Sequence, residues 1–218
     1  MRTYQALIFD LDGVLVDTAK HHFSAWQRLA QSFGISFNKE MNEQLKGISR
    51  VESLQMILSW GNIQLSPRDF DDAMKKKNSW YLEYIETMNP DEVLPGVRAF
   101  LEEAKKAGYK IGLGSASKNA QIILDKVLLT PYFDKIIDGN RTKKSKPDPE
   151  VFLLGSIDLA IPVEKCIVFE DAQAGVQAAK AGGMKAIGVG DPTILKEADL
   201  VIPGFANFSI SDLNSIKD

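Results

Sequence analysis

One short apolar stretch near the start of the chain constrains the fold more than any other feature. Residues 5–10 form a run of strand length that ends in Asp10, and Asp12 follows two residues later. Such a run is typical of a strand buried on both faces of a parallel sheet. A lone parallel strand cannot bury itself, yet the next strand candidate begins only at residue 109. Its partners must therefore come from the second half of the chain.

The segment between these two strands is predicted to be entirely helical. Apolar residues recur at helical spacing within 18–34, 37–46, 51–60 and 66–88. Ser49 stands where the third helix needs an N-cap, and Ser66 followed by Pro67 is a typical helix start. We therefore expect residues 16–92 to form an inserted, all-helical cap domain over the carboxyl end of the first strand.

Helices and strands alternate from residue 95 onward. Predicted strands cover 109–114, 133–137, 166–169, 184–189 and 200–202, and helices cover 97–107, 119–128, 150–159, 173–181 and 210–216. Parallel strands joined by crossover helices build a doubly wound sheet. Together with the first strand, residues 1–15 and 93–218 are expected to form a Rossmann-like α/β core.

Charge and cysteine content narrow the classes of function. The net charge of −3 offers no basic excess for a nucleic acid or a membrane surface, so we expect neither as a partner. The basic cluster Lys75–Lys77 is interpreted as a solvent-facing side of a helix. The single cysteine, Cys166, excludes a disulfide within the chain, and the first residues lack the apolar segment of a signal peptide. We therefore expect a cytoplasmic protein. Because the chain is acidic, with a self-contained core and cap, we also expect a monomer.

Polar side chains follow four of the predicted strands. They are Asp10 and Asp12, the hydroxyl-rich turn Ser115–Asn119, Lys146, and the pair Glu170-Asp171. Each has a simpler explanation when taken alone. The aspartates could belong to an Asp-Gly turn, the serines could cap a helix, the lysine could be a solvated loop cation, and the last two acids could be an exposed turn.

The coincidence of these groups predicts phosphoryl-transfer chemistry. Ligands bind at the carboxyl ends of parallel strands, and acids gathered there repel one another unless a cation compensates. Carboxylate oxygens with room for water and phosphate suit Mg2+. Ser115 and Lys146 could neutralise a transferring phosphoryl group. Asp10 could then attack phosphorus while Asp12 handles the proton.

The segment Asp10-Leu11-Asp12-Gly13-Val14 resembles the D-x-D-G-(T/V) motif of the haloacid dehalogenase superfamily. The other three polar groups occur in the order of that superfamily's second, third and fourth motifs. The resemblance covers essentially the whole chain. It implies an enzyme with Asp10 as the phosphorylated nucleophile, Asp12 as general acid/base, Ser115 and Lys146 as phosphoryl ligands, and Mg2+. The metal residues that it implies are Asp10, Asp12, Glu170 and Asp171.

Three further segments, 21–26, 42–50 and 115–119, resemble the helical-cap members that move a phosphoryl group between two positions of a sugar. This resemblance implies interconversion of β-D-glucose 1-phosphate and β-D-glucose 6-phosphate through an aspartyl phosphate and glucose 1,6-bisphosphate. The implied sugar-phosphate-binding residues are Leu11, His22, Lys46, Gly47, Ile48, Arg50, Ser117, Lys118 and Asn119.

The roles divide between cap and core. Gly47, Ile48 and Arg50 would hold the distal phosphate or the sugar, whereas the turn 117–119 would contact the sugar phosphate from the core. His22 would couple cap closure to the positioning of the acid/base. One departure from the pattern is that an acid is expected directly after Arg50, whereas Glu52 stands one position later.

Two other functions remain open from the sequence. A sugar-phosphate phosphatase of the same superfamily would also form an aspartyl phosphate, which water then discharges. The turn 46–50 favours the mutase, because a simple phosphatase needs no clamp for a second phosphate. A non-catalytic scaffold is disfavoured, since every catalytic position holds a competent residue.

Overall fold

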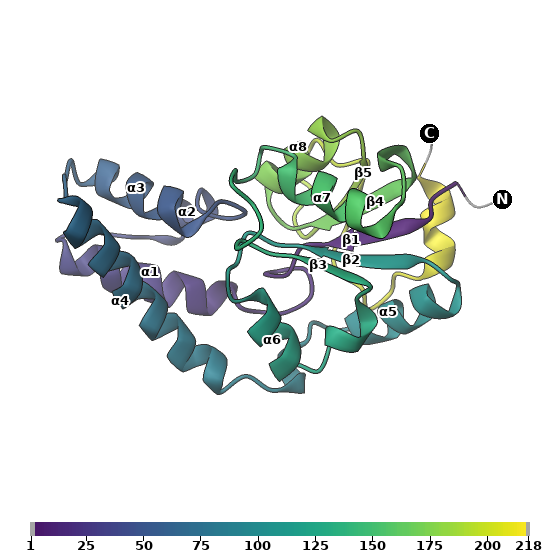
Figure 1. Ribbon diagram of the computed structural model, residues 1–218, viewed down its shortest axis with the longest axis horizontal. Helices are drawn as coiled ribbons and strands as arrows, with labels where there is room; N and C mark the ends of the chain where they lie inside the picture. The colour runs from purple at the N-terminus through teal and green to yellow at the C-terminus, as the bar shows by residue number, and fades with distance from the viewer. Residues whose placement is uncertain (1–2, 217–218) are drawn as a thin grey trace.

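The computed structural model describes residues 3–216 and is built around a parallel sheet of six strands (Figure 1). The strands are β1 (Ala6–Phe9), β2 (Lys110–Gly114), β3 (Lys135–Ile137), β4 (Cys166–Glu170), β5 (Lys185–Val189) and β6 (Leu200–Ile202). Their order in the sheet is β3-β2-β1-β4-β5-β6, and all five pairings are parallel. The predicted doubly wound α/β fold is therefore confirmed, with the strand order turning in opposite directions from β1.

The α-helices are α1 (Ala19–Ser32), α2 (Lys39–Glu43), α3 (Arg50–Trp60), α4 (Pro67–Glu86), α5 (Val97–Lys106), α6 (Ala120–Lys126), α7 (Glu150–Leu159) and α8 (Gln173–Ala181). The 3-10 helices are η1 (Pro90–Glu92), η2 (Thr130–Tyr132), η3 (Val163–Lys165) and η4 (Ile210–Ser215). The last of these replaces the helix predicted for 210–216.

Strand β1 divides the core into two apolar layers. Its four side chains are fully buried, and because strand side chains alternate, they reach opposite faces. Ala6 and Ile8 pack in the layer under α7 and α8, whereas Leu7 and Phe9 pack in the layer under α5, α6 and η4. Figure 1 shows α7 and α8 on one side of the sheet and α5 and α6 on the other.

An aromatic cluster supports the ends of the two central strands. The rings of Phe9 and Phe169 stack with centroids 4.7 Å apart and an angle of 5° between their planes. Phe100 and Phe205 pack against Phe169 at 5.5 and 5.4 Å. Because each stacked phenylalanine directly precedes an acid of the candidate site, this packing places Asp10 and Glu170 side by side.

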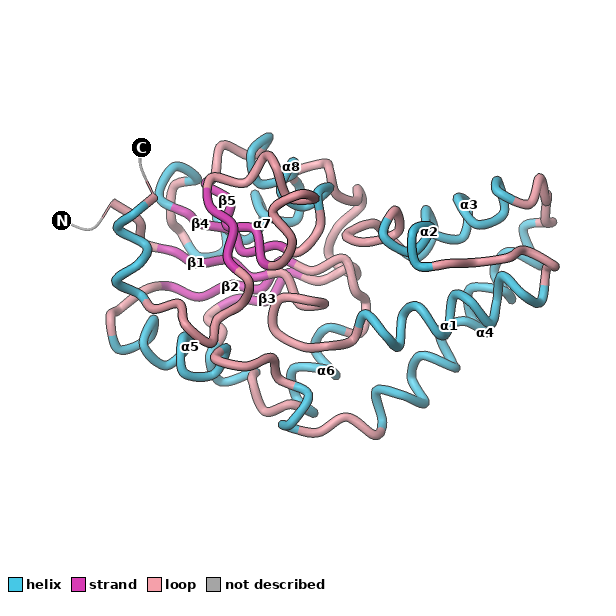
Figure 2. Tube along the Cα trace, turned by 180° about the vertical axis from the view of Figure 1, so that it is seen from behind, coloured by secondary structure: helices cyan, strands magenta, loops and turns pink. Residues whose placement is uncertain are grey.

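Helices α1 to α4 form the inserted block between β1 and β2. They pack around their own apolar cluster, which includes Trp26, Leu29, Leu54 and Ile57. The block projects beyond the carboxyl ends of the strands (Figure 2). In the described residues, no helix has the length and apolar character needed to cross a membrane.

The interpretation of Lys75–Lys77 as a solvent-facing cluster is wrong for Lys77. Only 2% of this residue is exposed. The buried positions of α4 are Ala73, Lys77, Tyr81 and Ile85, which lie four residues apart on one face of the helix. A run of three lysines says nothing about which face of the helix each one occupies. Lys75 and Lys76 are exposed as predicted, and Lys77 is not.

We predict that Gly96→Ala lowers the free energy of unfolding by about 3 kcal/mol or more, because it adds a steric clash to backbone strain. Gly96 has φ = +83°, and a Cβ there would overlap the backbone carbonyl of Phe205. Gly34→Ala is the matched control, since Gly34 has φ = +74° but no neighbouring atom would lie within 4 Å of an added Cβ. It should cost only about 1 kcal/mol. Urea denaturation measures both, and equal losses would contradict the role of the Phe205 contact.

Candidate functional site

The candidate site lies where β1 and β4 end, at the point from which the strand order runs in opposite directions. A cavity of about 390 Å3 opens there between the core and the helical block. Predicted site residues that line it are Asp10, Asp12, His22, Lys46, Gly47, Ile48, Arg50, Ser117, Lys118, Lys146 and Asp171. Leu11, Ser115, Asn119 and Glu170 stand behind this lining and are buried. The structure thus brings residues from both halves of the chain to one cavity.

A buried lysine joins the two central strands. Lys146 Nζ lies 2.6 Å from Asp10 Oδ1 and 2.5 Å from Glu170 Oε1. The second oxygen of Glu170 accepts the Ala172 N–H at 2.8 Å. Burial alone would lower the pKa of Lys146, but the two carboxylates outweigh it and hold the pKa above its usual value. The lysine therefore stays charged beside Asp10.

A second lysine approaches the site from the helical block. Lys46 Nζ lies 3.2 Å from Asp171 Oδ2 and 3.1 Å from Glu43 Oε2. Gly13 has φ = +81°, and a Cβ there would overlap the Asp171 carboxylate. A glycine at this position therefore lets Asp171 approach the loop that carries Asp12.

The donor set fits a divalent cation chemically, although lysines hold three of the four acids, namely Asp10, Glu170 and Asp171. Within residues 3–216, no three acidic, histidine or cysteine groups are gathered as a ready cation site. Burial raises the pKa values of Glu170 and Asp171 above their usual range. Burial, and then the charge of Asp10, raises the pKa of Asp12 to about 6. Burial, the main cause of these shifts, disfavours the charged carboxylates, and a bound cation would favour them again. Their hard oxygen atoms are ligands that a divalent metal ion prefers.

Asp12 is held by a chain of polar groups that reaches into the helical block. The Thr18 hydroxyl donates to Asp12 Oδ1, and His22 Nε2 lies 3.6 Å from the same oxygen. Lys77 Nζ lies 3.0 Å from His22 Nδ1. Burial, followed by the charge of Lys77, lowers the pKa of His22 well below 6.5. A neutral His22 can then accept from Lys77 and donate toward Asp12.

Sequence reasoning missed Thr18 and Lys77. Lys77 lies between the rings of Trp26 and Tyr81, 4.6 Å from each centroid. Burial, and then the charge of Arg50, lowers its pKa to about 7. The four-residue spacing of buried positions along α4 was the available signal for Lys77. Thr18 had none, because it stands before the first helix and resembles an ordinary cap.

The turn after β2 presents hydroxyls in a defined arrangement. Ser115 Oγ accepts the Ser117 N–H at 3.0 Å, and Ser117 Oγ accepts the Asn119 N–H at 3.2 Å. Asn119 Nδ2 donates to Asn78 Oδ1 of α4 at 3.1 Å. The serines act here as acceptors within the turn, which leaves their hydroxyl protons to be donated to an anion.

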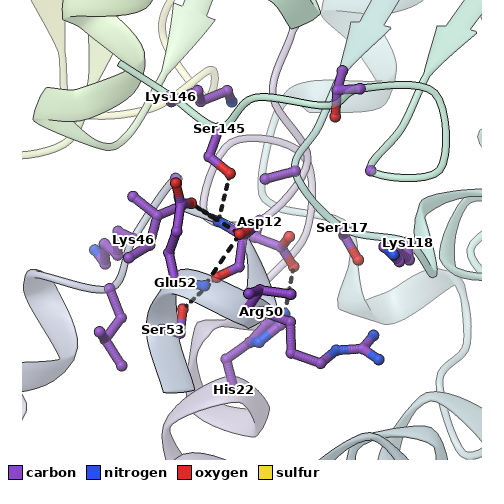
Figure 3. Close-up of a pocket in the computed structure, with 18 of the residues that line it drawn as sticks. Asp12, His22, Lys46, Arg50, Glu52, Ser53, Ser117, Lys118, Ser145 and Lys146 are labelled. Atoms are coloured by element: carbon purple, nitrogen blue, oxygen red, sulfur yellow. Dashed lines mark hydrogen bonds and ion pairs between the residues drawn. The ribbon is translucent and has the colours of Figure 1, made fainter. Parts of the chain in front are cut away.

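The opposite wall of the cavity is the turn before α3. Gly47 has φ = +76°, and the helix starts at Arg50 with Ser49 as its N-cap. Glu52 completes a capping box with Ser49, which gives the displaced acid a structural role. The Ser49 N–H also donates to Ser145 Oγ of the core at 3.2 Å. Figure 3 shows Arg50 below Ser117 and Lys118 at one side of the cavity and Lys46 at the other.

We predict that Lys77→Met raises the free energy of unfolding most below pH 7 and progressively less as the pH rises toward about 10. The folded pKa of Lys77, about 7, lies below the ordinary 10.5. In that window the unfolded chain binds a proton that the folded chain releases, so wild-type stability rises with pH relative to the variant. Urea denaturation at several pH values measures the difference in free energy of unfolding between Lys77→Met and the wild type.

The matched control is Lys75→Met, because the Lys75 side chain is 74% exposed. Its stability gap should not change with pH. A constant gap for Lys77→Met would show that Lys77 is not a buried ammonium group.

Comparisons with known proteins agree with this geometry. Residues 7–189 match the family model of the haloacid dehalogenase-like hydrolases. The chain is 42% identical over 200 residues to beta-phosphoglucomutase of Bacillus subtilis, covering 91% of this chain and 88% of the relative. It is 32% identical over 185 residues to a phosphorylated carbohydrates phosphatase of Thermotoga maritima, covering 84% and 83%.

A solved structure of beta-phosphoglucomutase from Clostridium difficile superimposes with a TM-score of 0.94. Its sequence is 39% identical, and the match covers 97% of this chain and 96% of that one. These matches extend over both the sheet and the inserted helices. The chain therefore belongs to the haloacid dehalogenase-like hydrolase family.

Proposed function

We propose that the protein is a phosphomutase that interconverts β-D-glucose 1-phosphate and β-D-glucose 6-phosphate. The observation that carries the proposal is one cavity with cationic groups at both walls. Lys46 and Arg50 come from the helical block, and Lys118 and Lys146 come from the core. A sugar bisphosphate needs two such walls. The 42% identity to a beta-phosphoglucomutase supports the same reaction.

The reaction begins with an aspartyl phosphate on Asp10. An oxygen of this phosphorylated side chain is bonded to phosphorus, and attack by a sugar hydroxyl forms a new P–O bond while the bond to Asp10 breaks. Asp12 takes the hydroxyl proton. The resulting glucose 1,6-bisphosphate turns round, and Asp10 removes the other phosphoryl group while Asp12 protonates the leaving sugar oxygen. A pKa of about 6 lets Asp12 perform both steps near neutral pH.

The cations of the site stabilise the transferring group. Lys146 is already held at Asp10 by the 2.6 Å contact, so its charge needs no rearrangement when negative charge develops. Ser115 and Ser117 offer hydroxyl protons from the neighbouring turn. Arg50, with its forked donors, suits the phosphate that is not being transferred.

We propose Mg2+ as the divalent cation, with Asp10, Asp12, Glu170 and Asp171 as the residues that would hold it. The hard carboxylate oxygens at the ends of β1 and β4 support a cation at this place. When bound, Mg2+ would neutralise phosphoryl oxygens as the phosphoryl group transfers.

We also propose how the chain is organised and where it acts. Residues 1–15 and 93–218 would form the core domain, and 16–92 the cap domain. The separate apolar cluster of α1 to α4 supports that division. A cytoplasmic location is consistent with the single, buried Cys166, which needs no oxidising compartment. We propose that the chain acts there as a monomer.

A sugar-phosphate phosphatase is the second candidate. The identity of 32% to a carbohydrate phosphatase supports it, and both reactions share the aspartyl phosphate. The distinction lies in what reaches the phosphorylated Asp10 first. A mutase presents a sugar hydroxyl under a closed cap, whereas a phosphatase admits water.

A substrate panel tests the proposed function. We expect β-glucose 1-phosphate, with a trace of glucose 1,6-bisphosphate and Mg2+, to give glucose 6-phosphate much faster than free phosphate. α-Glucose 1-phosphate should react poorly. Asp10→Asn should lower turnover by at least about 10³-fold, because the variant lacks the nucleophile. Phosphate release without isomerisation would favour the phosphatase.

We predict that Arg50→Ala lowers mutase turnover by at least about tenfold, because a charged hydrogen bond to the distal phosphate is lost. Hydrolysis of the aspartyl phosphate should change little, since water needs no such clamp. Arg68→Ala is the control, because Arg68 is an exposed arginine of α4 outside the cavity. If Arg50→Ala slows both reactions equally, Arg50 does not hold the distal phosphate.

A further inference from the structure

The loop that leads to Lys146 carries two more lysines along the edge of the cavity. Lys143 and Lys144 line the cavity, although the proposed chemistry uses neither. We call them the outer lysine pair. The whole chain has a net charge of −3, so this local positive charge is not part of a generally basic surface. Its position suggests a task at the cavity entrance.

The backbone beneath the outer lysine pair is anchored. Glu150 Oε2 accepts the N–H groups of Lys143 at 2.8 Å and Lys144 at 2.6 Å. Asp148 Oδ1 accepts the N–H of Glu150 at 3.1 Å. One residue further on, Ser145 accepts the hydrogen bond from Ser49 of the helical block. The backbone that carries the two lysines is therefore held in a defined position beside Ser145 and Lys146.

The start of the same loop is fastened to the predicted phosphate-binding turn. Asn140 Nδ2 donates to the Lys118 carbonyl at 3.0 Å, and the Gly139 N–H donates to the Ser117 carbonyl at 3.2 Å. A Cβ at Gly139 would overlap the Ala116 carbonyl, so the approach needs glycine. Lys118 and the outer lysine pair consequently belong to one connected stretch of the cavity wall.

The outer lysine pair is more available to a ligand than the inner lysines. Lys146 is buried between Asp10 and Glu170, and Lys46 is held by two acids. Lys144 contacts Asp148 at 3.0 Å but is 71% exposed. Within residues 3–216, Lys143 forms no side-chain ion pair, and it is exposed.

We infer that Lys143 and Lys144, beside Lys118, form an outer anion-binding position that holds the second phosphate of a sugar bisphosphate while the molecule turns round. The inference rests on the proposed function, because only a mutase must retain a bisphosphate between two transfers. Ammonium groups at the entrance attract a doubly phosphorylated ligand more strongly than a singly phosphorylated one. Because these groups are exposed, the attraction weakens as salt is added.

Binding to the inactive Asp10→Asn protein tests the inference. Calorimetry would compare glucose 1,6-bisphosphate with glucose 6-phosphate at low salt and at about 0.5 M salt. Adding Lys143→Gln and Lys144→Gln should weaken bisphosphate binding about five- to tenfold at low salt, as two exposed charges allow. At high salt the loss should fall below about twofold, and glucose 6-phosphate should lose less than about twofold under either condition.

Two further variants separate this effect from its alternatives. Lys75→Gln with Lys196→Gln removes the same net charge from exposed residues outside the cavity and should leave binding unchanged. Lys143→Arg with Lys144→Arg keeps the charges and should keep the affinity. Equal losses in the two glutamine pairs, equal losses for the two ligands, or a loss in the arginine pair would overturn the inference.

Turnover of the otherwise wild-type enzyme distinguishes the inference from the proposed function. Glucose 1,6-bisphosphate would start the cycle by phosphorylating Asp10. In the enzyme with Asp10 intact, Lys143→Gln with Lys144→Gln should raise the bisphosphate concentration that gives half-maximal turnover by about five- to tenfold. If the wild type isomerises the sugar phosphate but Lys143→Gln with Lys144→Gln leaves bisphosphate binding unchanged, the inference is overturned and the proposed function is not. Lys-dependent bisphosphate binding without isomerisation would overturn the proposed mutase function, and with it the assigned purpose of the pair.

Discussion

The structure depends on one buried lysine held between two carboxylates. Lys146 touches Asp10 at the end of β1 and Glu170 at the end of β4, and all three groups are removed from solvent. Removing one partner of such a group leaves a charge uncompensated, which typically costs about 3–5 kcal/mol. The contact thereby ties the two central strands to the loop before α7. It also leaves a fixed positive charge beside the carboxylate proposed as nucleophile.

The apolar core and this polar contact support each other. Phe9 and Phe169 stack one residue before Asp10 and Glu170, so packing in the sheet determines where the carboxylates stand. The order of the strands turns in opposite directions from β1, and such a reversal leaves a crevice at the carboxyl ends of the strands. Beyond it, polar contacts from the helical block complete the cavity: Lys46 to Asp171, Ser49 to Ser145, and Asn78 to Asn119.

The polar chain from Lys77 through His22 to Asp12 extends the site into the helical block. It links Asp12, the proposed acid/base group, to α1 and α4, which carry His22 and Lys77. A closed block excludes water, and exclusion of water favours a sugar hydroxyl over hydrolysis. Whether a sugar hydroxyl or water attacks the phosphorylated enzyme therefore depends on the contacts between the helical block and the core as much as on Asp10.

The order and spacing of apolar and polar residues along the chain were sufficient to predict the fold class and to locate the four motifs of the core. A buried strand reads as an apolar run, helices show their periodicity, and groups that follow parallel strands must meet at one edge. The insertion was equally visible, because a stretch without strand candidates separates residue 10 from residue 109. The sequence contained less information about which polar side chains of the helical block are buried. Three neighbouring lysines are typical of a charged, exposed surface, whereas the position of Lys77 on the buried face of α4 removes it from solvent.

Tertiary structure alone decided which charges neutralise one another. Chain order and local periodicity were enough to predict that acids and lysines follow particular strands. They did not determine that Lys146 bridges Asp10 and Glu170, that Thr18 bonds Asp12, or that Glu52 caps α3. Those pairings depend on distances of a few ångströms between side chains, some from segments more than one hundred residues apart. Only packing of the sheet and the helical block sets such distances, and electrostatic interaction strength follows from them.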